Sequence, residues 1–292
     1  MIAAERIALP KGVGFTRRLK DRAFTVFLWT CAVVALVPLV VITLFVIGRG
    51  ISALSLDFFI KTPTGPLDPT GGGIAEAFIG TLLIVGMACL ISIPLGLLTA
   101  VYLAEYAKGR TGDVIRFVCQ ILLSVPSIIA GLVIAAFVVT AMHTFSALAG
   151  AIAISVLMWP VITRATEEVL RLVPQELREG ALALGLPRWK VILRVVVPTA
   201  GAGILTAIML AVARGLGETA PLLLTVLGSD YINTNPFKPT DAVPLRIYQY
   251  ARQPIEQLQH LAWGAAVILM AGVLLLSIGA RILSNRQQKR IG

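Results

Sequence analysis

Charged residues are scarce in this sequence, and acidic residues are the scarcer kind. Only 14% of the 292 residues are charged, with 15 Asp and Glu against 25 Lys and Arg. A soluble domain usually carries about 25% charged residues, so the composition argues against a soluble globular protein. Hydrophobic residues make up 57% of the chain, and the mean hydropathy is +0.88. We therefore expect an all-α membrane protein whose helices meet lipid.

The sequence also has few residues of the kinds that carry chemistry. Cys31, Cys89 and Cys119 fall in apolar runs, where we expect small buried hydrophobic residues rather than disulfides or metal ligands. His143 and His260 are far apart in the sequence, which disfavours a metal site or a catalytic pair. The sequence has no nucleotide-binding P-loop and no paired-carboxylate motif. We expect a protein without a catalytic site, metal or cofactor of its own.

Six apolar runs are long enough to cross a ~30 Å hydrocarbon layer, which takes roughly 20 helical residues. Most lysines and arginines lie in the N-terminal tail, in the turn near residues 108–116, in the segment 164–198 and at the C-terminal end. The positive-inside rule then predicts that both termini are cytoplasmic, N-in and C-in. The net charge of +10 follows this topology, so nucleic-acid binding is not expected. The six predicted transmembrane helices are 24–47, 74–103, 114–142, 147–163, 201–227 and 261–283.

The inner segment 164–198 is too regular in pattern to be a linker. Pro174 suits the first turn of a helix, and Gly185 suits the left-handed position just past a helix end. Pro187 can begin the next helix, so we predict two short helices joined by a glycine elbow.

A narrow apolar stripe follows the first of these helices. Leu177, Ala181 and Leu184 are spaced to share one helix face. Such a stripe either docks into a partner's groove or packs against the chain's own spans. The sequence leaves these two alternatives even.

The stretch "RGLGETAPLL", residues 214–223, places a charged pair inside an apolar run. Arg214 is at the centre of the predicted span 201–227, where a charge costs roughly 2.5–3.5 kcal/mol on insertion scales. Glu218 is four residues further on, so both side chains share a helix face. A guanidinium is well matched to phosphate oxygens, and Thr219 adds a hydroxyl. We predict that these three residues line a substrate pathway; the alternative is a salt bridge that only fixes packing.

Glycines and a proline accompany this pair. Pro221 lacks the N–H that would bond to the carbonyl of Gly217, while Gly215 and Gly217 permit close helix approach. We predict that Gly215, Gly217 and Pro221 form a kink.

The segment "EGALALG" followed by "VVVP" resembles the EAA motif of ATP-driven import permeases. Glu179, Ala181, Gly185 and Pro198 match that motif at its spacing, whereas Gly180 replaces its first alanine. In that family the elbow is a coupling helix, held in a cleft of a cytoplasmic ATPase subunit. The resemblance implies the type I importer permease fold. It also implies that the ATPase contacts are made by Glu179, Gly180, Ala181, Gly185, Leu186 and Pro187.

Three further stretches resemble the phosphate-specific import permeases. They are "GTLLIVGMACLISIPLGLLTAVYLAEYA" (80–107), "SVPSIIAGL" (124–132) and "ARGLGETAPLL" (213–223), and the residues after Gly-Glu-Thr are similar to the PstA type. The charge distribution predicts a basic cytoplasmic tail (1–23), and the resemblance implies a transmembrane permease domain (24–292) with its core at 71–283 and its cytoplasmic coupling segment at 164–198.

The resemblance also implies the partners. These are a second, homologous permease, a homodimeric cytoplasmic ATPase that binds ATP and Mg, an extracytoplasmic phosphate-binding protein, and the lipid of a bacterial cytoplasmic membrane. Two alternatives stay open. The cargo can be another oxyanion, such as sulfate or molybdate, because one arginine does not discriminate among tetrahedral anions. The chain can also be an ion-coupled anion carrier, although a carrier has no need of the elbow segment.

Overall fold

The computed structural model describes residues 15–64 and 72–291, and side chains within 19–64 and 72–282. Much of the predicted basic tail, 1–23, lies outside these residues. The described residues are helical apart from loops and one isolated bridge between Leu227 and Thr240, which confirms the predicted all-α class. The helices are α1 (Phe15–Gly50), α2 (Leu56–Ile60), α3 (Ala75–Val101), α4 (Arg110–Ser124), α5 (Ser127–Ile134), α6 (Thr140–Met142), α7 (Ala147–Arg171), α8 (Gln175–Ala183), α9 (Arg188–Val191), α10 (Val197–Thr199), α11 (Gly201–Leu216), α12 (Ala220–Thr225), α13 (Val243–Ala251) and α14 (Glu256–Ile291).

The chain forms two compact units, Met1–Gly48 and Arg49–Gly292. The first is supplied by α1, which contains the predicted span 24–47 and exposes apolar side chains on every face, including Trp29. A helix that is apolar all round is stable only where lipid or another protein covers it. Of the three cysteines, Cys119 is buried as expected and Cys89 is partly buried, but Cys31 on α1 is exposed.

Among the described residues, four helices are long and apolar enough to cross a membrane, and up to six spans result if each of two bent pairs is one span. The predicted run 114–142 is not one helix, because α4 and the helical stretch that begins at α5 meet at 102°. Pro126 explains the bend, since proline lacks an N–H and disfavours the helical conformation of the residue before it. The predicted run 201–227 is also wrong as one helix, because α11 ends at Leu216.

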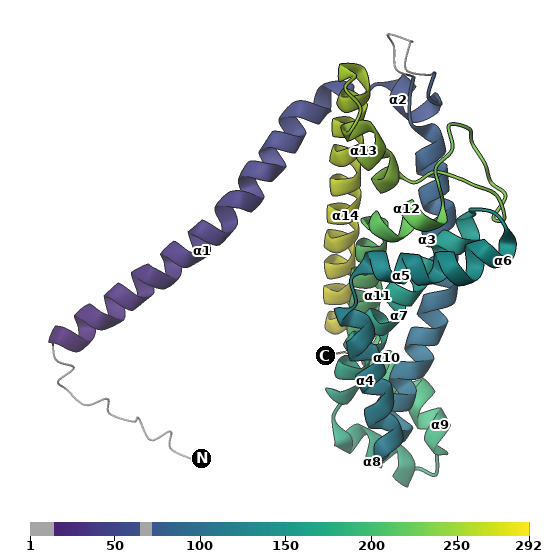
Figure 1. Ribbon diagram of the computed structural model, residues 1–292. Coiled ribbons are helices and arrows are strands. Elements are labelled where there is room, and N and C mark those ends of the chain that lie inside the picture. The colour runs from purple at the N-terminus through teal and green to yellow at the C-terminus, as the bar shows by residue number, and fades with distance from the viewer. Residues whose placement is uncertain (1–14, 65–71, 292) are drawn as a thin grey trace. The chain divides into compact units, whose positions relative to one another are not determined.

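Small residues bring the long helices of the second unit together. Helices α3 and α7 run side by side (Figure 1), and Gly96 of α3 lies against the side chain of Ile162. Gly215 of α11 lies against Ile154 and Met158 of α7 in the same way. Side chains at these glycines would overlap their neighbours, so close packing of this kind requires them.

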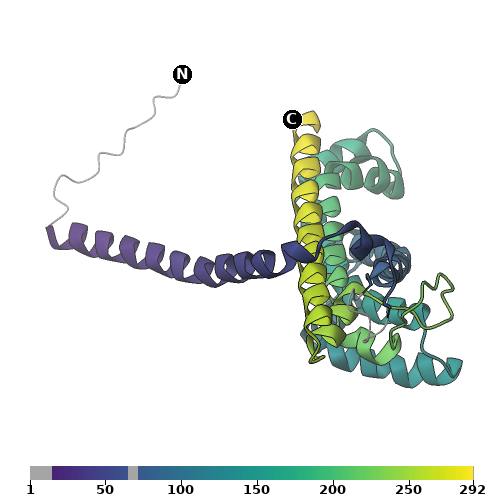
Figure 2. The ribbon, with the colours of Figure 1, turned by 90° about the horizontal axis from the view of Figure 1, so that it is seen from above.

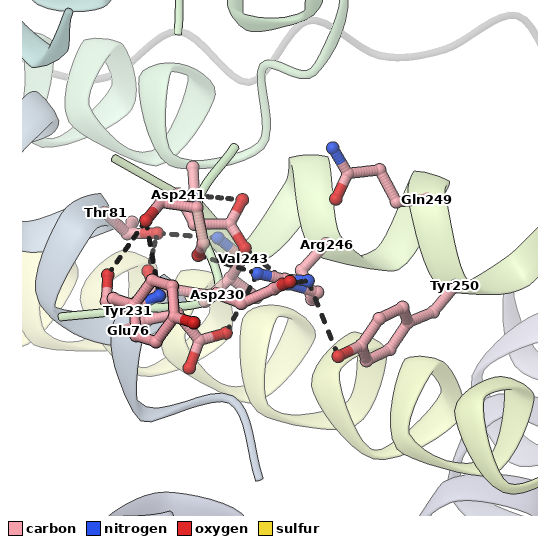
Figure 3. Close-up of polar contacts among 12 residues, drawn as sticks. Glu76, Thr81, Asp230, Tyr231, Asp241, Val243, Arg246, Gln249 and Tyr250 are labelled. Atoms are coloured by element: carbon pink, nitrogen blue, oxygen red, sulfur yellow. Dashed lines mark hydrogen bonds and ion pairs between the residues drawn. The ribbon is translucent and has the colours of Figure 1, made fainter. Parts of the chain in front are cut away.

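A buried arginine holds the end of this unit that carries α2 and α13. Arg246 of α13 makes ion pairs with Glu76 at the start of α3, with Asp241 and with Asp230 of the preceding loop (Figure 3). The Glu76 and Asp230 contacts are 3.1 and 2.9 Å long. Arg246, Glu76 and Asp241 are almost fully buried, whereas Asp230 is exposed. We call these four residues the Arg246 cluster.

The Arg246 cluster places three carboxyl groups around one guanidinium group. Burial raises the pKa of Asp241 to about 6, although Arg246 opposes this shift, and burial also raises the pKa of Tyr250 to about 12. Burial alone would lower the pKa of Arg246, but Asp241 and the other acidic neighbours raise it further above its usual range. Arg246 is therefore the cation on which three carboxylates depend.

Replacing Arg246 with glutamine should destabilise the protein by about 3–5 kcal/mol, because breaking a buried ion pair leaves uncompensated charge behind. The readout is the apparent Tm of the detergent-purified protein and its abundance in membranes. Arg252→Gln is the matched control: Arg252 is an exposed arginine directly after α13 that contacts Tyr248, so its loss should cost under about 0.5 kcal/mol. Equal Tm values for the two variants would contradict the role given to Arg246.

Candidate functional site

The predicted pathway residues lie at a complete helix break. Arg214 is in the last turn of α11, and Gly217 follows the helix end. The side chains of Arg214 and Glu218 form the predicted pair, with 3.3 Å between Nε and Oε1. Arg214 is 44% exposed and Glu218 14% exposed. A cation also suits the C-terminal end of a helix, where the last carbonyls point outward.

The break replaces the kink that the sequence predicts. Pro221 lies in the first turn of α12 rather than inside a bent helix, so its missing N–H leaves no bond unmade. Thr219 makes no side-chain cap; its carbonyl accepts from the N–H groups of Leu222 and Leu223 at 3.1 and 3.2 Å. The hydroxyl of Thr219 therefore does not cap its own helix.

The short helix after the break packs against α5. Both helices lie across the direction of α3 and α14 (Figure 1), and they contact each other along their lengths. A side-chain carbon at Gly131 of α5 would lie 2.6 Å from the Cα of Pro221, so only glycine fits there. The proline-bounded bend before α5 and the break before α12 thus belong to one layer beside Arg214.

The predicted elbow forms as expected at the other end of the unit. Helix α8 ends in a Schellman motif, in which the N–H of Gly185 donates to the carbonyl of Leu182 at 2.9 Å and that of Leu186 to the carbonyl of Ala181 at 3.4 Å. Gly185 has a φ of 80°, in the left-handed region that favours glycine. Pro187 then precedes α9. Gly185, Leu186 and Pro187 together set the angle between α8 and α9.

Part of the apolar stripe of α8 packs against the chain's own helices, and part is left exposed, as docking to a partner would require. Ala181 is buried in a core cluster with Leu170, Val191 and Ile204, so it packs against the chain's own helices. Leu184 is 84% exposed, and Leu177 and Leu182 are each 45% exposed. Glu179 and Gly180 are exposed too, and Gly180 has open space where a side chain would be. The face around Leu184 is left uncovered.

Two arginines tie the elbow to the helical turn Tyr102–Tyr106, which continues α3 and forms its end. Arg178 donates to a carboxylate oxygen of Glu105 at 2.9 Å and to the carbonyls of Val173 and Leu170 at 2.7 and 2.8 Å. Arg188 donates to the carbonyl of Glu105 and stacks over the Tyr106 ring. Glu105 is therefore the anchor of the elbow. The sequence offered no signal for it, because the contacts join residues more than 70 positions apart.

A second anchor joins α4 to α7. Glu167 of α7 is 1% exposed and receives three guanidinium groups, from Arg116, Arg164 and Arg171, at 2.7, 2.8 and 2.7 Å. Arg116 also donates to the carbonyl of Leu103 at 3.0 Å. The spacing of Arg164, Glu167 and Arg171 along one helix was a local signal for part of this group, but the contact with Arg116 was not predictable from spacing.

The two sets of predicted residues form separate sites. Arg214 is near the far end of α11 from the elbow, roughly 20 Å along the helix from Gly201 at 1.5 Å per residue. Figures 1 and 2 both place α8 and α9 away from α5 and α6. Any influence of the elbow on Arg214 must therefore pass through the long helices.

Curated relatives extend over most of the chain. A phosphate transport system permease protein PstA from Xylella fastidiosa (strain 9a5c) is 44% identical over 83% of this chain and 84% of its own length. PstA of Yersinia pestis is 40% identical over 93% and 92%. PstA 1 of Mycobacterium tuberculosis (strain ATCC 25618 / H37Rv) is 42% identical over 94% and 91%.

Solved structures show the same fold at low identity. A chain of a bacterial ABC transporter involved in the import of the acidic polysaccharide alginate superposes with a TM-score of 0.57 at 16% identity, covering 92% of this chain and 99% of that one. A chain of the inward-facing MetNI methionine ABC transporter gives 0.56 at 19%, covering 74% and 94%. The family model of binding-protein-dependent transport system inner membrane components matches residues 92–289. The chain belongs to this family and, within it, to the phosphate transport permeases of the PstA type.

Proposed function

We propose that the chain is the transmembrane permease subunit of an ATP-driven importer that moves inorganic phosphate across the bacterial cytoplasmic membrane. The observation that carries this proposal is identity of 40–44% to phosphate permeases over most of the chain. The Arg214–Glu218 pair at a helix break supports it, since a half-exposed guanidinium in an apolar helix needs an anion, a partner or water. The chain itself has no catalytic role in this scheme.

The complex contains a second, homologous permease, a homodimeric ATPase and an extracytoplasmic phosphate-binding protein. The ATPase binds ATP and Mg, and the binding protein selects the anion. Both termini and the elbow face the cytoplasm, and the Arg246 cluster faces outward. The elbow docks through Glu179, Gly180, Gly185 and the uncovered face around Leu184.

Movement of the ATPase reaches the membrane helices through the two anchors. Pulling α8 displaces Glu105 at the end of α3, because Arg178 and Arg188 hold it. The three arginines on Glu167 carry the same displacement to α4 and α7. Helix α7 packs against α5 and against α11, which ends two residues after Arg214.

At the break, phosphate displaces the carboxylate of Glu218 and binds the guanidinium of Arg214 in its place. Arg214 lowers the barrier to an anion in a region of low dielectric constant. Glu218 prevents trapping, because it reclaims Arg214 when phosphate leaves. Thr219 contributes a hydroxyl that no helix cap occupies.

Arg214→Ala should reduce uptake of radiolabelled phosphate by roughly tenfold or more at equal complex abundance, since hydrogen bonds to charged groups are worth about 1.5–3 kcal/mol. Arg214→Lys should retain part of the uptake, because lysine keeps the charge but loses the planar fork. Normal uptake by the alanine variant would remove Arg214 from the pathway. Parallel assays with sulfate and molybdate test the alternative cargoes, and uptake that survives ATP depletion would favour an ion-coupled carrier.

Leu184→Asp should lower the amount of ATPase that co-purifies with the permease by roughly tenfold or more. A buried leucine at an interface is worth about 1.5–3 kcal/mol, and a carboxylate in an apolar groove adds a desolvation cost. The control is Phe237→Asp, at an apolar residue on the loop before α13 that is 59% exposed. Both variants should elute as single species. Full ATPase retention by Leu184→Asp would contradict the docking face.

A further inference from the structure

A cavity of about 420 Å³ lies behind the elbow, between α8, α9 and the ends of α3 and α7. This volume is within the ~300–1,000 Å³ that is usual for small-ligand sites. The polar side chains in its wall are those of Glu105, Arg171, Gln175, Arg178 and Arg188. Leu182 of α8 also lines this cavity, whereas Leu184, at the centre of the proposed docking face, does not.

The cavity wall has an excess of positive charge. It contains three guanidinium groups and one carboxylate. Glu105 is committed to Arg178 at 2.9 Å and is 7% exposed. The counter-ion of Arg171 is Glu167, whose two oxygens also serve Arg116 and Arg164. Arg171 therefore has donors left over that its own carboxylate does not satisfy.

Arg178 has a structural role in this wall, because its guanidinium donates to Glu105 and to two backbone carbonyls. Its Nε–H is inaccessible, so an occupant of the cavity does not reach it. Arg171 and Arg188 are exposed and keep donors that an occupant can reach. An oxyanion in the cavity supplies phosphate oxygens, the acceptors that forked guanidinium groups bind best.

Aromatic residues near this cavity indicate its depth relative to the membrane surface. Tyr102 and Tyr106 in the turn after α3 are 39% and 42% exposed, and Trp189 of α9 is 55% exposed. Tyrosine and tryptophan gather where membrane helices meet the headgroup region. Basic pockets between helices on the cytoplasmic side hold phospholipid headgroups. The cavity therefore contains donors suited to phosphate and lies at the depth of the lipid headgroups.

We propose that this cavity is a second anion site, separate from Arg214, that binds a phosphate group through Arg171 and Arg188. The phosphate group is that of an anionic inner-leaflet lipid or free inorganic phosphate. Its occupant bridges the elbow to the ends of α3 and α7 and so stiffens the connection between the ATPase and the membrane helices. The inference rests on the proposed cytoplasmic placement of the elbow but not on phosphate being the cargo.

The test uses the purified importer complex without its binding protein. One arm measures radiolabelled inorganic phosphate by equilibrium dialysis; the other counts phosphatidylglycerol retained from phosphatidylcholine–phosphatidylglycerol nanodiscs by native mass spectrometry. Arg171→Gln and the double variant with Arg188→Gln should weaken binding of one probe by roughly tenfold or more per arginine. Loss in the first arm identifies free phosphate, and loss in the second identifies the lipid headgroup.

Arg194→Gln is the control, because it removes the same charge from the neighbouring turn outside the cavity wall. ATPase co-purification shows that each variant complex is assembled. Unchanged binding of both probes to the double variant overturns the site, as does equal weakening in the Arg194→Gln control. Arg214→Gln separates the two proposals, since it should alter the pathway and leave this site intact.

Discussion

Lipid offers no partner to a charged side chain, so the charges of this chain must be satisfied within the protein or be held where a ligand can reach them. The charge clusters follow this constraint. Glu167 receives three arginines, and Arg246 receives three carboxylates. These clusters lie at the ends of the long helices, where they fix the segments that join one helix to the next. The apolar helices between them can then pack through glycines set against aliphatic side chains.

The two anchors near the elbow make the end of the bundle respond as a unit. Glu105 and Glu167 each bind arginines from a different part of the chain, so α3, α4, α7 and the elbow share their ionic contacts. Displacing one of these elements without the others would separate buried opposite charges, which is costly. The Schellman motif at Gly185 adds a rigid turn to this connection. The proposed coupling therefore needs no flexible hinge at the elbow itself.

The sequence predicts those features that depend on local pattern. Apolar runs locate α1, α3, α7 and α14, and the Pro174, Gly185 and Pro187 signals locate α8 and α9. The sequence does not locate helix ends inside apolar runs, such as the end of α11 at Leu216. The hydrophobic pattern continues unchanged across such a break, because the residues on both sides are packed inside the protein. It cannot supply the Arg246 cluster or the Glu105 anchor, since these join distant residues whose meeting depends on packing. For the Arg214–Glu218 pair, four-residue spacing was sufficient.

Arg214 differs from the buried arginines in a way that bears on transport. Arg246 is 4% exposed and contacts three carboxylates, so an incoming anion could not displace them without stranding buried charge. Arg214 is 44% exposed and, in the described part of the chain, pairs with one carboxylate at 3.3 Å. When this single pair opens, one half-exposed guanidinium loses one carboxylate, so exchange for an external anion strands less buried charge than at Arg246. The incomplete burial of the Arg214–Glu218 pair is therefore the property that the proposed exchange requires, whereas the saturated clusters elsewhere are suited to holding helices in place.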